Sequence, residues 1–343
     1  MLVLPRTALL ALMLAGCAGP DVQTWATSEQ PPRLASEQAV MNDGYRLPLR
    51  HWGSPKSAHA VVLALHGFND YRNAFAELGP YLADREVITY AYDQRGFGAT
   101  AERGHWAGSG RMIADLRNVA SLLRQRYPHL PLYLLGESMG GAVVMAAGGT
   151  GATGVILVAP AVWSRDTMNP VERFALWAAS HTAPWLKVSG RGLHIWPSDN
   201  RNMLRAFSAD PLVIKETRID ALWGVTNLMD RAAAAAGGVR PPALILYGEH
   251  DEIIPKRAFC AMVHSLPRNA PGLRLVLYAH GWHMLTRDLQ GARVRADIAA
   301  WLDDTSAALP SGEETARGGS RLARLCRGQA PSGVAARPPV ALN

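Results

Sequence analysis

The chain has little cysteine, little charge and no internal repeat. Its 343 residues include 3 cysteines, and charged residues make up 18%. The cysteines show none of the spacings of a metal site. Three cysteines are also too few for a disulfide framework. We therefore expect no metal and no organic cofactor, and we expect Cys260 and Cys326 to be free thiols. The hydrophobic fraction of 48% is typical of a globular protein with a large core.

The formal net charge of +7 is concentrated at the two ends of the chain. Six arginines lie in the terminal segments, and no acidic residue follows Glu314. Removing these six leaves about +1 for the body of the protein, too little for the broad basic surface that nucleic-acid binding requires. We therefore expect no nucleic-acid partner. The six residues are Arg6, Arg317, Arg321, Arg324, Arg327 and Arg337.

The N-terminus is typical of a targeting segment. Arg6 precedes a short apolar run, residues 8–15, which is too short to span a bilayer. The run closes in Leu-Ala-Gly-Cys at Cys17, which resembles the lipobox of bacterial lipoproteins. That resemblance implies removal of residues 1–16, lipidation of the cysteine and a tether over 17–36. We expect a protein of the cell envelope, lipid-anchored at the outer membrane of a Gram-negative bacterium. The alternative is a cleaved secretory signal and a soluble periplasmic protein.

Apolar runs alternate with helical patterns along the body of the chain. The runs are continuous, as in strands that are buried on both faces of a sheet. Because helical stretches separate most of them, the order indicates βαβ crossovers and predicts an α/β fold with a mostly parallel, eight-stranded sheet. Strands are expected at 38–42, 45–52, 61–65, 87–92, 132–135, 155–158, 244–247 and 273–278, and helices at 75–84, 112–127, 139–148, 256–265 and 292–303.

One stretch interrupts this order. Residues 163–235 show no strand pattern, are helical in character and are rich in large apolar residues. We expect a helical lid here, inserted between late strands of a core that spans 37–162 and 236–304. Part of its apolar set is expected to pack inward and part to line a surface for an apolar ligand. The segment 305–343 consists largely of Gly, Ser, Ala, Pro and Arg, and is predicted to be disordered.

A serine lies on a sharp turn between a predicted strand and a predicted helix. The segment Gly136-Glu137-Ser138-Met139-Gly140 has the pattern G-x-S-x-G. Strand, turn and helix form the setting of a nucleophile elbow, in which the serine adopts a strained backbone conformation. The two glycines leave the space that such a turn needs. Ser138 is therefore the candidate nucleophile.

Two late loops offer the groups that would activate this serine. A serine hydroxyl needs a base of nearly neutral pKa, and a histidine in that role needs a carboxylate to orient it. The loop after 244–247 carries three acids, and the loop after the last strand carries two histidines. Both loops follow carboxyl ends of strands, where open parallel sheets bind ligands. We favour Asp251 as the acid and His283 as the base. Their rivals are Glu249, Glu252 and His280.

Taken together, the motifs resemble those of the α/β-hydrolases. Within that superfamily the chain resembles the monoacylglycerol lipase and lysophospholipase group, which is related to the serine aminopeptidases. The resemblance extends over residues 38–303, and one departure is Glu137, where relatives usually carry histidine. The matching segments are His66-Gly67, Asp93-Gln94-Arg95-Gly96-Phe97-Gly98, Gly136-Glu137-Ser138-Met139-Gly140-Gly141, Gly248-Glu249-His250-Asp251 and His283-Met284-Leu285.

The resemblance implies a role for each candidate residue. Ser138, Asp251 and His283 would form the catalytic triad, in the chain order of this superfamily. The backbone N–H groups of Phe68 and Met139 would form the oxyanion hole. The expected activity is hydrolysis of a carboxylic ester, monoacylglycerol or lysophospholipid, through an acyl-enzyme intermediate, with the membrane as a partner through the lipid anchor.

Two other functions remain open from the sequence. The first is an aminopeptidase or amidase on the same scaffold, which a cluster of acidic residues in the lid would favour. The second is an envelope binding module that has lost catalysis. A complete set of serine, acid and histidine argues against the second alternative.

Overall fold

The predicted leader at 1–16 and Cys17 lie outside the residues that the structure describes, as do residues 328–343. Within the described part, no helix has the length and apolar character needed to cross a membrane. No group of histidine, cysteine or acidic side chains in the described part is arranged to hold a metal ion. The structure, a computed structural model, describes residues 19–24, 30–190, 192 and 194–327.

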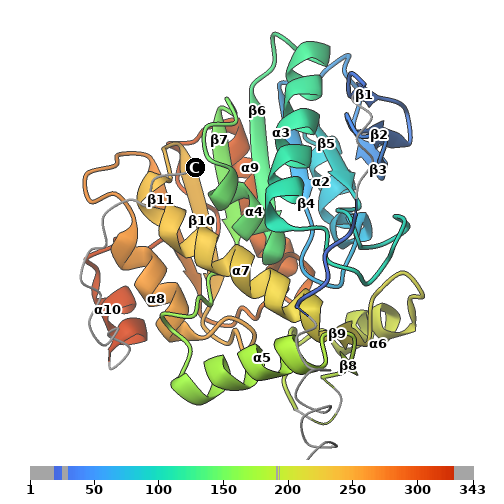
Figure 1. Ribbon diagram of the computed structural model, residues 1–343. Coiled ribbons are helices and arrows are strands. Elements are labelled where there is room, and N and C mark those ends of the chain that lie inside the picture. Colours follow the sequence, from blue (N-terminus) through green and yellow to red (C-terminus); the bar gives the residue numbers. More distant parts are fainter. Residues whose placement is uncertain (1–18, 25–29, 191, 193, 328–343) are drawn as a thin grey trace, which may run out of the picture.

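Nine strands of the described chain form one sheet (Figure 1). They are β1 (Arg33–Leu34), β2 (Gln38–Val40), β3 (Arg46–Trp52), β4 (Ala60–Leu65), β5 (Val87–Tyr92), β6 (Leu132–Glu137), β7 (Gly154–Val158), β10 (Ala243–Gly248) and β11 (Leu273–Tyr278). Their order is β1-β2-β3-β5-β4-β6-β7-β10-β11, parallel from β5 to β11 and antiparallel at the β1–β3 edge. The mostly parallel α/β sheet is confirmed, with β1 as one strand more than the eight expected.

Helices cover both faces of this sheet (Figure 1). One face carries α3 (Ser109–Arg126), α4 (Met139–Ala147), α7 (Ile219–Ala235) and α8 (Lys256–Ser265), and the other carries α2 (Leu78–Ala83) and α9 (Gly291–Asp303). Each face has its own cluster of buried apolar side chains, because the central strands are apolar on both sides. Strand β4, for example, is buried along its whole length. The helix expected at 75–84 is split into α2 and a preceding 3-10 turn, η1 (Arg72–Phe75).

The insertion between β7 and β10 is smaller than the predicted lid at 163–235. It contains α5 (Pro170–Thr182), β8 (Lys187–Val188), α6 (Arg201–Ala209) and β9 (Thr217–Arg218). The β8–β9 pair was not predicted, since two-residue strands are too short to show a periodic pattern. Helix α7 belongs to the core, because Leu228 and Ala232 are fully buried in the cluster that α4 also joins. The part of the insertion outside this core therefore ends near residue 218.

Helix α5 of this insertion is fixed by its cap more than by a buried face. Asn169 Oδ1 accepts a hydrogen bond from Glu172 N–H (2.8 Å), and the Glu172 carboxylate accepts one from Asn169 N–H (3.1 Å). This reciprocal capping box, with Pro170 at the first helical position, starts the helix. Its large apolar side chains stay in contact with solvent, with Phe174 66% and Trp177 50% exposed.

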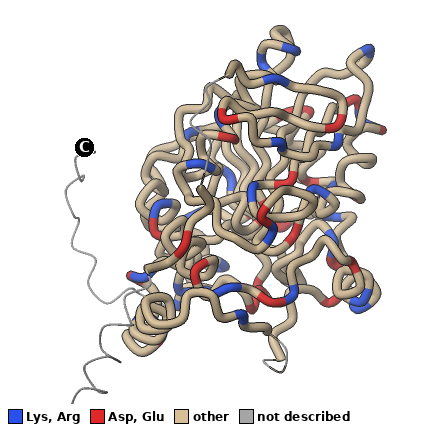
Figure 2. Tube along the Cα trace, turned by 45° about the vertical axis from the view of Figure 1, so that its right-hand side comes forward, with Lys and Arg blue, Asp and Glu red and all other residues tan. Residues whose placement is uncertain are grey.

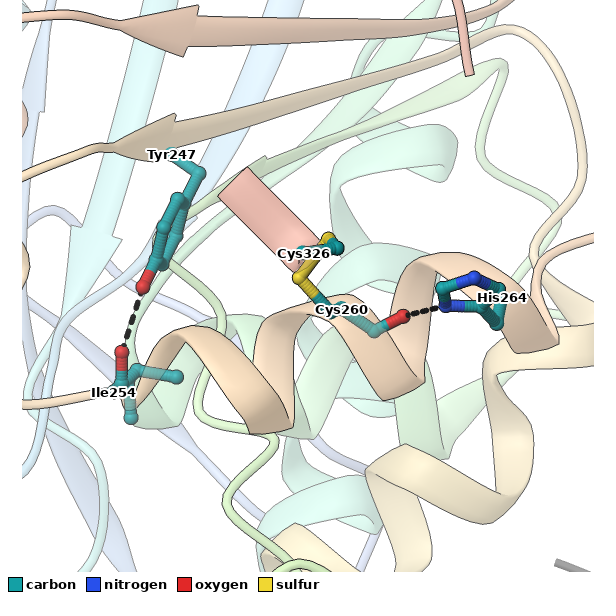
Figure 3. Close-up of a disulfide and its surroundings, with 5 residues drawn as sticks. All are labelled: Tyr247, Ile254, Cys260, His264 and Cys326. Atoms are coloured by element: carbon teal, nitrogen blue, oxygen red, sulfur yellow. Dashed lines mark hydrogen bonds between the residues drawn. A yellow bond between two sulfur atoms is a disulfide. The ribbon is translucent and has the colours of Figure 1, made fainter. Parts of the chain in front are cut away.

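The prediction that the two remaining cysteines are free thiols is wrong. Cys260 of α8 and Cys326 of α10 (Ser320–Cys326) form a disulfide, whereas both were expected to be free (Figure 3). Helix α10 packs on α8, so the two sulfurs meet although 66 positions separate them in the sequence. Cysteine spacing alone carries no information about this contact, because it depends on where the C-terminal segment folds.

Residues 305–327, the described part of the C-terminal segment, are folded, whereas the whole of 305–343 was predicted to be disordered. Glu314 forms a β-bridge with Val276 of β11. Leu309 and Leu322 are buried in the two apolar clusters. A composition of small and basic residues predicted a solvated segment, but a few apolar anchors and backbone hydrogen bonds suffice to fold it onto the sheet edge.

The described part of the predicted tether at 17–36 also lies on the domain. Gln23 N–H donates to Trp106 O (2.9 Å) and its side chain is buried. Gln30 N–H donates to Asn42 O (2.7 Å), and β1 pairs with β2. A polar, Pro-containing composition is equally compatible with an edge segment that is held by its backbone, which is why the sequence did not reveal this packing.

Charged residues of both signs are interspersed along the described trace (Figure 2). This distribution fits the nearly neutral body expected from the sequence. In the C-terminal segment, Arg321 pairs with Glu249 (2.7 Å) and Glu313 (3.0 Å). The basic residues there are thus partly used in folding the segment onto the domain.

Candidate active site

Ser138 lies on the turn between β6 and α4. Its backbone has φ 53° and ψ −115°, a conformation that costs a non-glycine residue about 1–3 kcal/mol. The turn is tight, because a Cβ on Gly140 would lie 2.1 Å from Leu65 O and one on Gly136 would lie 2.5 Å from the Gly140 backbone. Ser138 N–H donates to Val158 O of β7 (2.9 Å). This is the strand–turn–helix geometry that the motif predicts.

His283 and Asp251 meet at the ends of two neighbouring strands. Nδ1–H of His283 donates to Asp251 Oδ2 at 2.8 Å. The other oxygen, Oδ1, accepts the N–H groups of Ile253 (2.8 Å) and Ile254 (2.9 Å), so the carboxylate is held in place. Because Nδ1 carries the proton in this bond, Nε2 of His283 is left to act as a base.

The rival residues have other partners. Glu249 forms an ion pair with an arginine of the C-terminal segment, and Glu252 accepts the Trp196 N–H (2.6 Å). His280 stacks on His250, with 6.4 Å between the ring centroids. The structure therefore brings together the acid and the base that the sequence favours.

The charge state of His283 is governed by its surroundings. Burial disfavours the charged imidazolium, but the charge and hydrogen bond of Asp251 outweigh it, so the pKa of His283 lies above its ordinary value. Glu137 and Asp288 act in the same direction. An imidazolium that forms when the serine gives up its proton is thereby stabilised.

The loop after β4 is fixed by His66. This side chain is fully buried, and its Nδ1–H donates to Gly67 O (2.8 Å) while its Nε2 accepts Gln94 N–H (3.0 Å). Burial lowers the pKa of His66, which keeps the ring neutral, as these two bonds require. The loop lies against the nucleophile, since a Cβ on Gly67 would be 3.3 Å from Ser138 Cβ. His66 therefore supports the loop.

The two expected oxyanion donors adjoin the serine. Met139 opens α4, where the first N–H groups have no partner within the helix. Phe68 follows Gly67, and its ring packs against Phe97 (5.6 Å between centroids) and Trp106 (6.5 Å). This packing holds the peptide whose N–H is the proposed donor. The assignment of both N–H groups to an oxyanion hole stays a prediction.

A buried arginine that the sequence analysis missed lies between two carboxylates. The Nη2 atom of Arg287 is 2.6 Å from Glu137 Oε1 and 2.8 Å from Asp70 Oδ2. The guanidinium is almost fully buried, and burial alone would lower its pKa, but the charges of the two carboxylates outweigh burial and raise the pKa of Arg287. No sequence signal marks this cluster, because its members come from three separate segments of the chain.

The insertion is joined to the loop of His283 by four hydrogen bonds. Residues 197–200 supply one side and residues 284–289 supply the other. Burial raises the pKa of Asp288, one of the acceptors, to about 6. The bonds are Met284 N–H to Pro197 O (2.9 Å), Ser198 Oγ–H to Asp288 Oδ1 (2.6 Å), Asn200 Nδ2–H to Arg287 O (3.0 Å) and Leu289 N–H to Asp199 Oδ1 (2.9 Å).

A pocket lies between the loop after β4 and α6 of the insertion. Its walls include Asp70, Tyr71 and Arg287 on one side, and Phe207 and Asp210 on the other. Tyr71 O–H donates to Asp210 Oδ2 (2.6 Å), and burial raises the pKa of this phenol. The pocket thus combines apolar and polar surface, and it includes Asp70 and Arg287 of the buried charge cluster.

Comparison with known proteins agrees with the fold and with a hydrolase activity. The family described as serine aminopeptidase, S33, matches residues 56–290. The monoacylglycerol lipase of Mycolicibacterium smegmatis is 24% identical over 76% of this chain and 93% of its own length. The monoglyceride lipase of Rattus norvegicus is 24% identical over 77% of this chain and 88% of its own length.

Two solved structures extend the comparison to the fold. The monoacylglycerol lipase of Paleococcus ferrophilus has a TM-score of 0.64 and 22% identity, covering 76% of this chain and 99% of that chain. A soluble variant of monoglyceride lipase from Saccharomyces cerevisiae has a TM-score of 0.66 and 20% identity, covering 84% and 98%.

The family match, the lipase relatives and the α/β-hydrolase fold identify a serine ester hydrolase. The chain belongs to the serine aminopeptidase S33 family, whose profile spans more than half of it.

Proposed function

We propose that the protein hydrolyses esters with a single acyl chain, of the monoacylglycerol or lysophospholipid type. The observation that carries the proposal is the buried His283–Asp251 pair at the same sheet edge as the strained Ser138. The choice of substrate is supported by the relatives, since several that match most of this chain are named monoacylglycerol or monoglyceride lipases.

The reaction follows from the positions of these groups. Ser138 Oγ attacks the ester carbonyl while Nε2 of His283 takes its proton, and Asp251 stabilises the resulting imidazolium. The N–H groups of Phe68 and Met139 hold the oxyanion of the tetrahedral intermediate. The imidazolium then gives its proton to the leaving alcohol, which leaves the acyl group on the serine. A water molecule, activated by the same histidine, releases the fatty acid and restores the enzyme.

The surroundings of the site suit an amphipathic substrate. The insertion exposes a set of large apolar side chains, to which an acyl chain or a lipid aggregate can bind. The pocket near Asp70 and Tyr71 offers polar groups for a glycerol or phosphate-bearing head group. The exposed apolar residues are Val171, Phe174, Trp177, Trp185, Leu186, Val188, Ile195 and Trp196.

The proposed location is the cell envelope, with Cys17 as a lipidated N-terminus at the outer membrane of a Gram-negative bacterium. The short apolar run that ends at this cysteine supports the anchor. The Cys260–Cys326 disulfide supports export, because disulfides persist in oxidising compartments. Metabolic labelling with a fatty-acid analogue, compared between wild type and Cys17→Ala, tests the anchor; equal labelling of the two would contradict it.

The activity is tested with a substrate series on the purified protein. Monoacylglycerols and lysophospholipids of increasing chain length are assayed beside an aminoacyl amide. We expect turnover of the esters, greatest at medium or long chains. Turnover of the amide alone would instead identify an aminopeptidase. Turnover of none, together with no reaction of the folded protein with a fluorophosphonate, would leave a binding module.

A further inference from the structure

We propose that Arg287 is a positioning residue for catalysis, which holds the nucleophile elbow and the loop after β4 against the loop of the base. It acts through its ion pairs with Glu137 and Asp70. The inference rests on the proposed function only in assuming that Ser138 is the nucleophile, and it holds for any ester that the site accepts.

The sheet order makes such a connection necessary. Ser138 follows β6 and His283 follows β11, and β7 and β10 lie between these strands. Three strand spacings of about 4.8 Å place the two strand ends roughly 14 Å apart. The loop after β11 must therefore reach across two strands, and the Asp251–His283 bond connects it only to its immediate neighbour, β10.

Arg287 makes this missing connection. It lies in η3 (Leu285–Arg287), directly after the base. Glu137 immediately precedes the nucleophile, and Asp70 lies two residues beyond the proposed donor Phe68. Among the side-chain hydrogen bonds and ion pairs of the described residues, the one between Arg287 and Glu137 alone joins residues 283–289 to residues 136–141. One guanidinium thus joins the loop of the base to the segments that carry the nucleophile and the proposed donor Phe68.

The cluster is poorly suited to a purely stabilising role. Burying this cluster removes three charges from water, and their mutual attraction offsets this cost only with complete hydrogen bonding. Within the described residues, Glu137 Oε2 and Arg287 Nε are buried without a hydrogen-bond partner. Asp70 Oδ2 is within ion-pair distance of Arg287 Nη2, but the two groups are not aligned for a hydrogen bond. A buried charge cluster with unsatisfied hydrogen-bonding groups adds little to the stability of the protein, but it still fixes the relative positions of the segments that it joins.

A second buried arginine provides a matched control. Arg95 is 2% exposed and also bridges two carboxylates, through Nε to Asp115 (2.6 Å) and through Nη1 to Asp43 (2.7 Å). Asp43 lies in the turn between β2 and β3, and Asp115 lies in α3. Neither segment supplies a group to the triad, and this cluster is also more completely hydrogen-bonded than the first.

The test compares Arg287→Lys with Arg95→Lys in the full chain. Lysine keeps the charge, but its shorter side chain and its ammonium group do not reproduce the reach and direction of the Nη2 atom with which Arg287 contacts both carboxylates. For Arg287→Lys we expect kcat per titrated active site to fall roughly 10- to 100-fold, because a misplacement of about 1 Å has effects of this size, with KM changed less than threefold. For Arg95→Lys we expect a lower thermal midpoint and a kcat per active site within twofold of wild type.

Glu137→Gln gives an independent readout should Arg287→Lys fail to fold. Removing this charge takes away one contribution that raises the pKa of His283. The acid limb of the kcat/KM profile should therefore move to lower pH. If both residues act through one bond, the double variant Glu137→Gln/Arg287→Lys should lose less than the product of the two single losses in kcat.

The outcomes separate this inference from the proposed function. The rate of Ser138 phosphonylation by a fluorophosphonate is measured for all variants, because it reports the nucleophile and base without a natural substrate. A fall of at least tenfold in Arg287→Lys and none in Arg95→Lys supports the positioning role, even if the lipid esters prove to be the wrong substrates. Equal rates in wild type and Arg287→Lys, or equal losses in both arginine variants, would overturn it.

Discussion

The carboxyl edge of the sheet and the helical insertion near it are built in opposite ways. At the edge, Ser138, Asp251 and His283 are 8%, 6% and 5% exposed, and the loops that carry them are joined by hydrogen bonds and buried charges. In the insertion, Phe174 and Trp177 of α5 are among many large apolar side chains that face solvent.

This difference indicates that the sheet edge carries the catalytic groups and that the insertion contacts the substrate. Groups at the edge are held by internal contacts, so their positions do not depend on a substrate. Outer side chains of the insertion have little internal role, so they are free to contact an apolar ligand. Substitutions at the edge should therefore act on kcat, and those in the insertion on KM for long-chain substrates.

The strongest test of the comparison is Ser138→Ala. We expect kcat to fall about 10⁴-fold or more, since the nucleophile is lost, while the protein stays folded. Ester turnover measured beside a thermal melt distinguishes loss of chemistry from unfolding. Turnover within tenfold of wild type would contradict the assignment of the nucleophile.

A second prediction concerns the core far from the edge. Cys326→Ser removes a cross-link that spans 66 positions, and we expect the free energy of unfolding to fall by about 2–4 kcal/mol. Denaturant unfolding of the variant and of wild type, without reductant, measures this difference. Because α10 supplies no group to the triad, kcat at room temperature should be unchanged; a proportional loss of kcat would show that the edge and this part of the core are coupled.

The third prediction concerns the insertion. Replacing both Phe174 and Trp177 by serine should raise KM for long-chain monoacylglycerol roughly 3- to 10-fold, which corresponds to about 1 kcal/mol of lost contact. Turnover of a short-chain ester serves as the control and should not change. The thermal midpoint should also stay close to that of wild type. A large fall in kcat for both esters would mean that the insertion shapes the edge itself.

The smallest effect is expected in the pH profile. The pKa of His283 lies above its ordinary value, and only the neutral ring can accept the serine proton. Activity should therefore be lost as the pH falls through this raised pKa, with the midpoint of the acid limb of kcat/KM above about 6.5. The insertion variant should show the same midpoint. An acid limb below pH 6 would contradict the influence of the surrounding carboxylates.

The sequence predicted those features that leave a local pattern. Buried parallel strands give continuous apolar runs, and the nucleophile elbow gives glycines at fixed offsets from Ser138. Loop position narrows the acid and the base to two loops, because carboxyl ends of parallel strands meet at one edge. The choice of Asp251 and His283 within these loops comes from the resemblance to the α/β-hydrolases.

What the sequence did not reveal depends on contacts between distant segments. The pairing of Cys260 with Cys326 requires the last described residues to fold onto α8. The assignment of α7 to the core requires knowing which helix it packs against, since its apolar pattern fits a lid equally well. The same holds for Arg287, because the role of a single arginine can be inferred only once its contacts with two carboxylates from distant segments are known.

The most direct test of the central claim is to trap the acyl-enzyme. Purified protein is mixed with a slowly hydrolysed long-chain ester, quenched in acid and examined by intact mass and by mapping of the peptide that contains Ser138. The account predicts a mass increase of one acyl group, located on that serine and absent from Ser138→Ala. Steady ester turnover by Ser138→Ala, or an acyl group on a different residue, would contradict it.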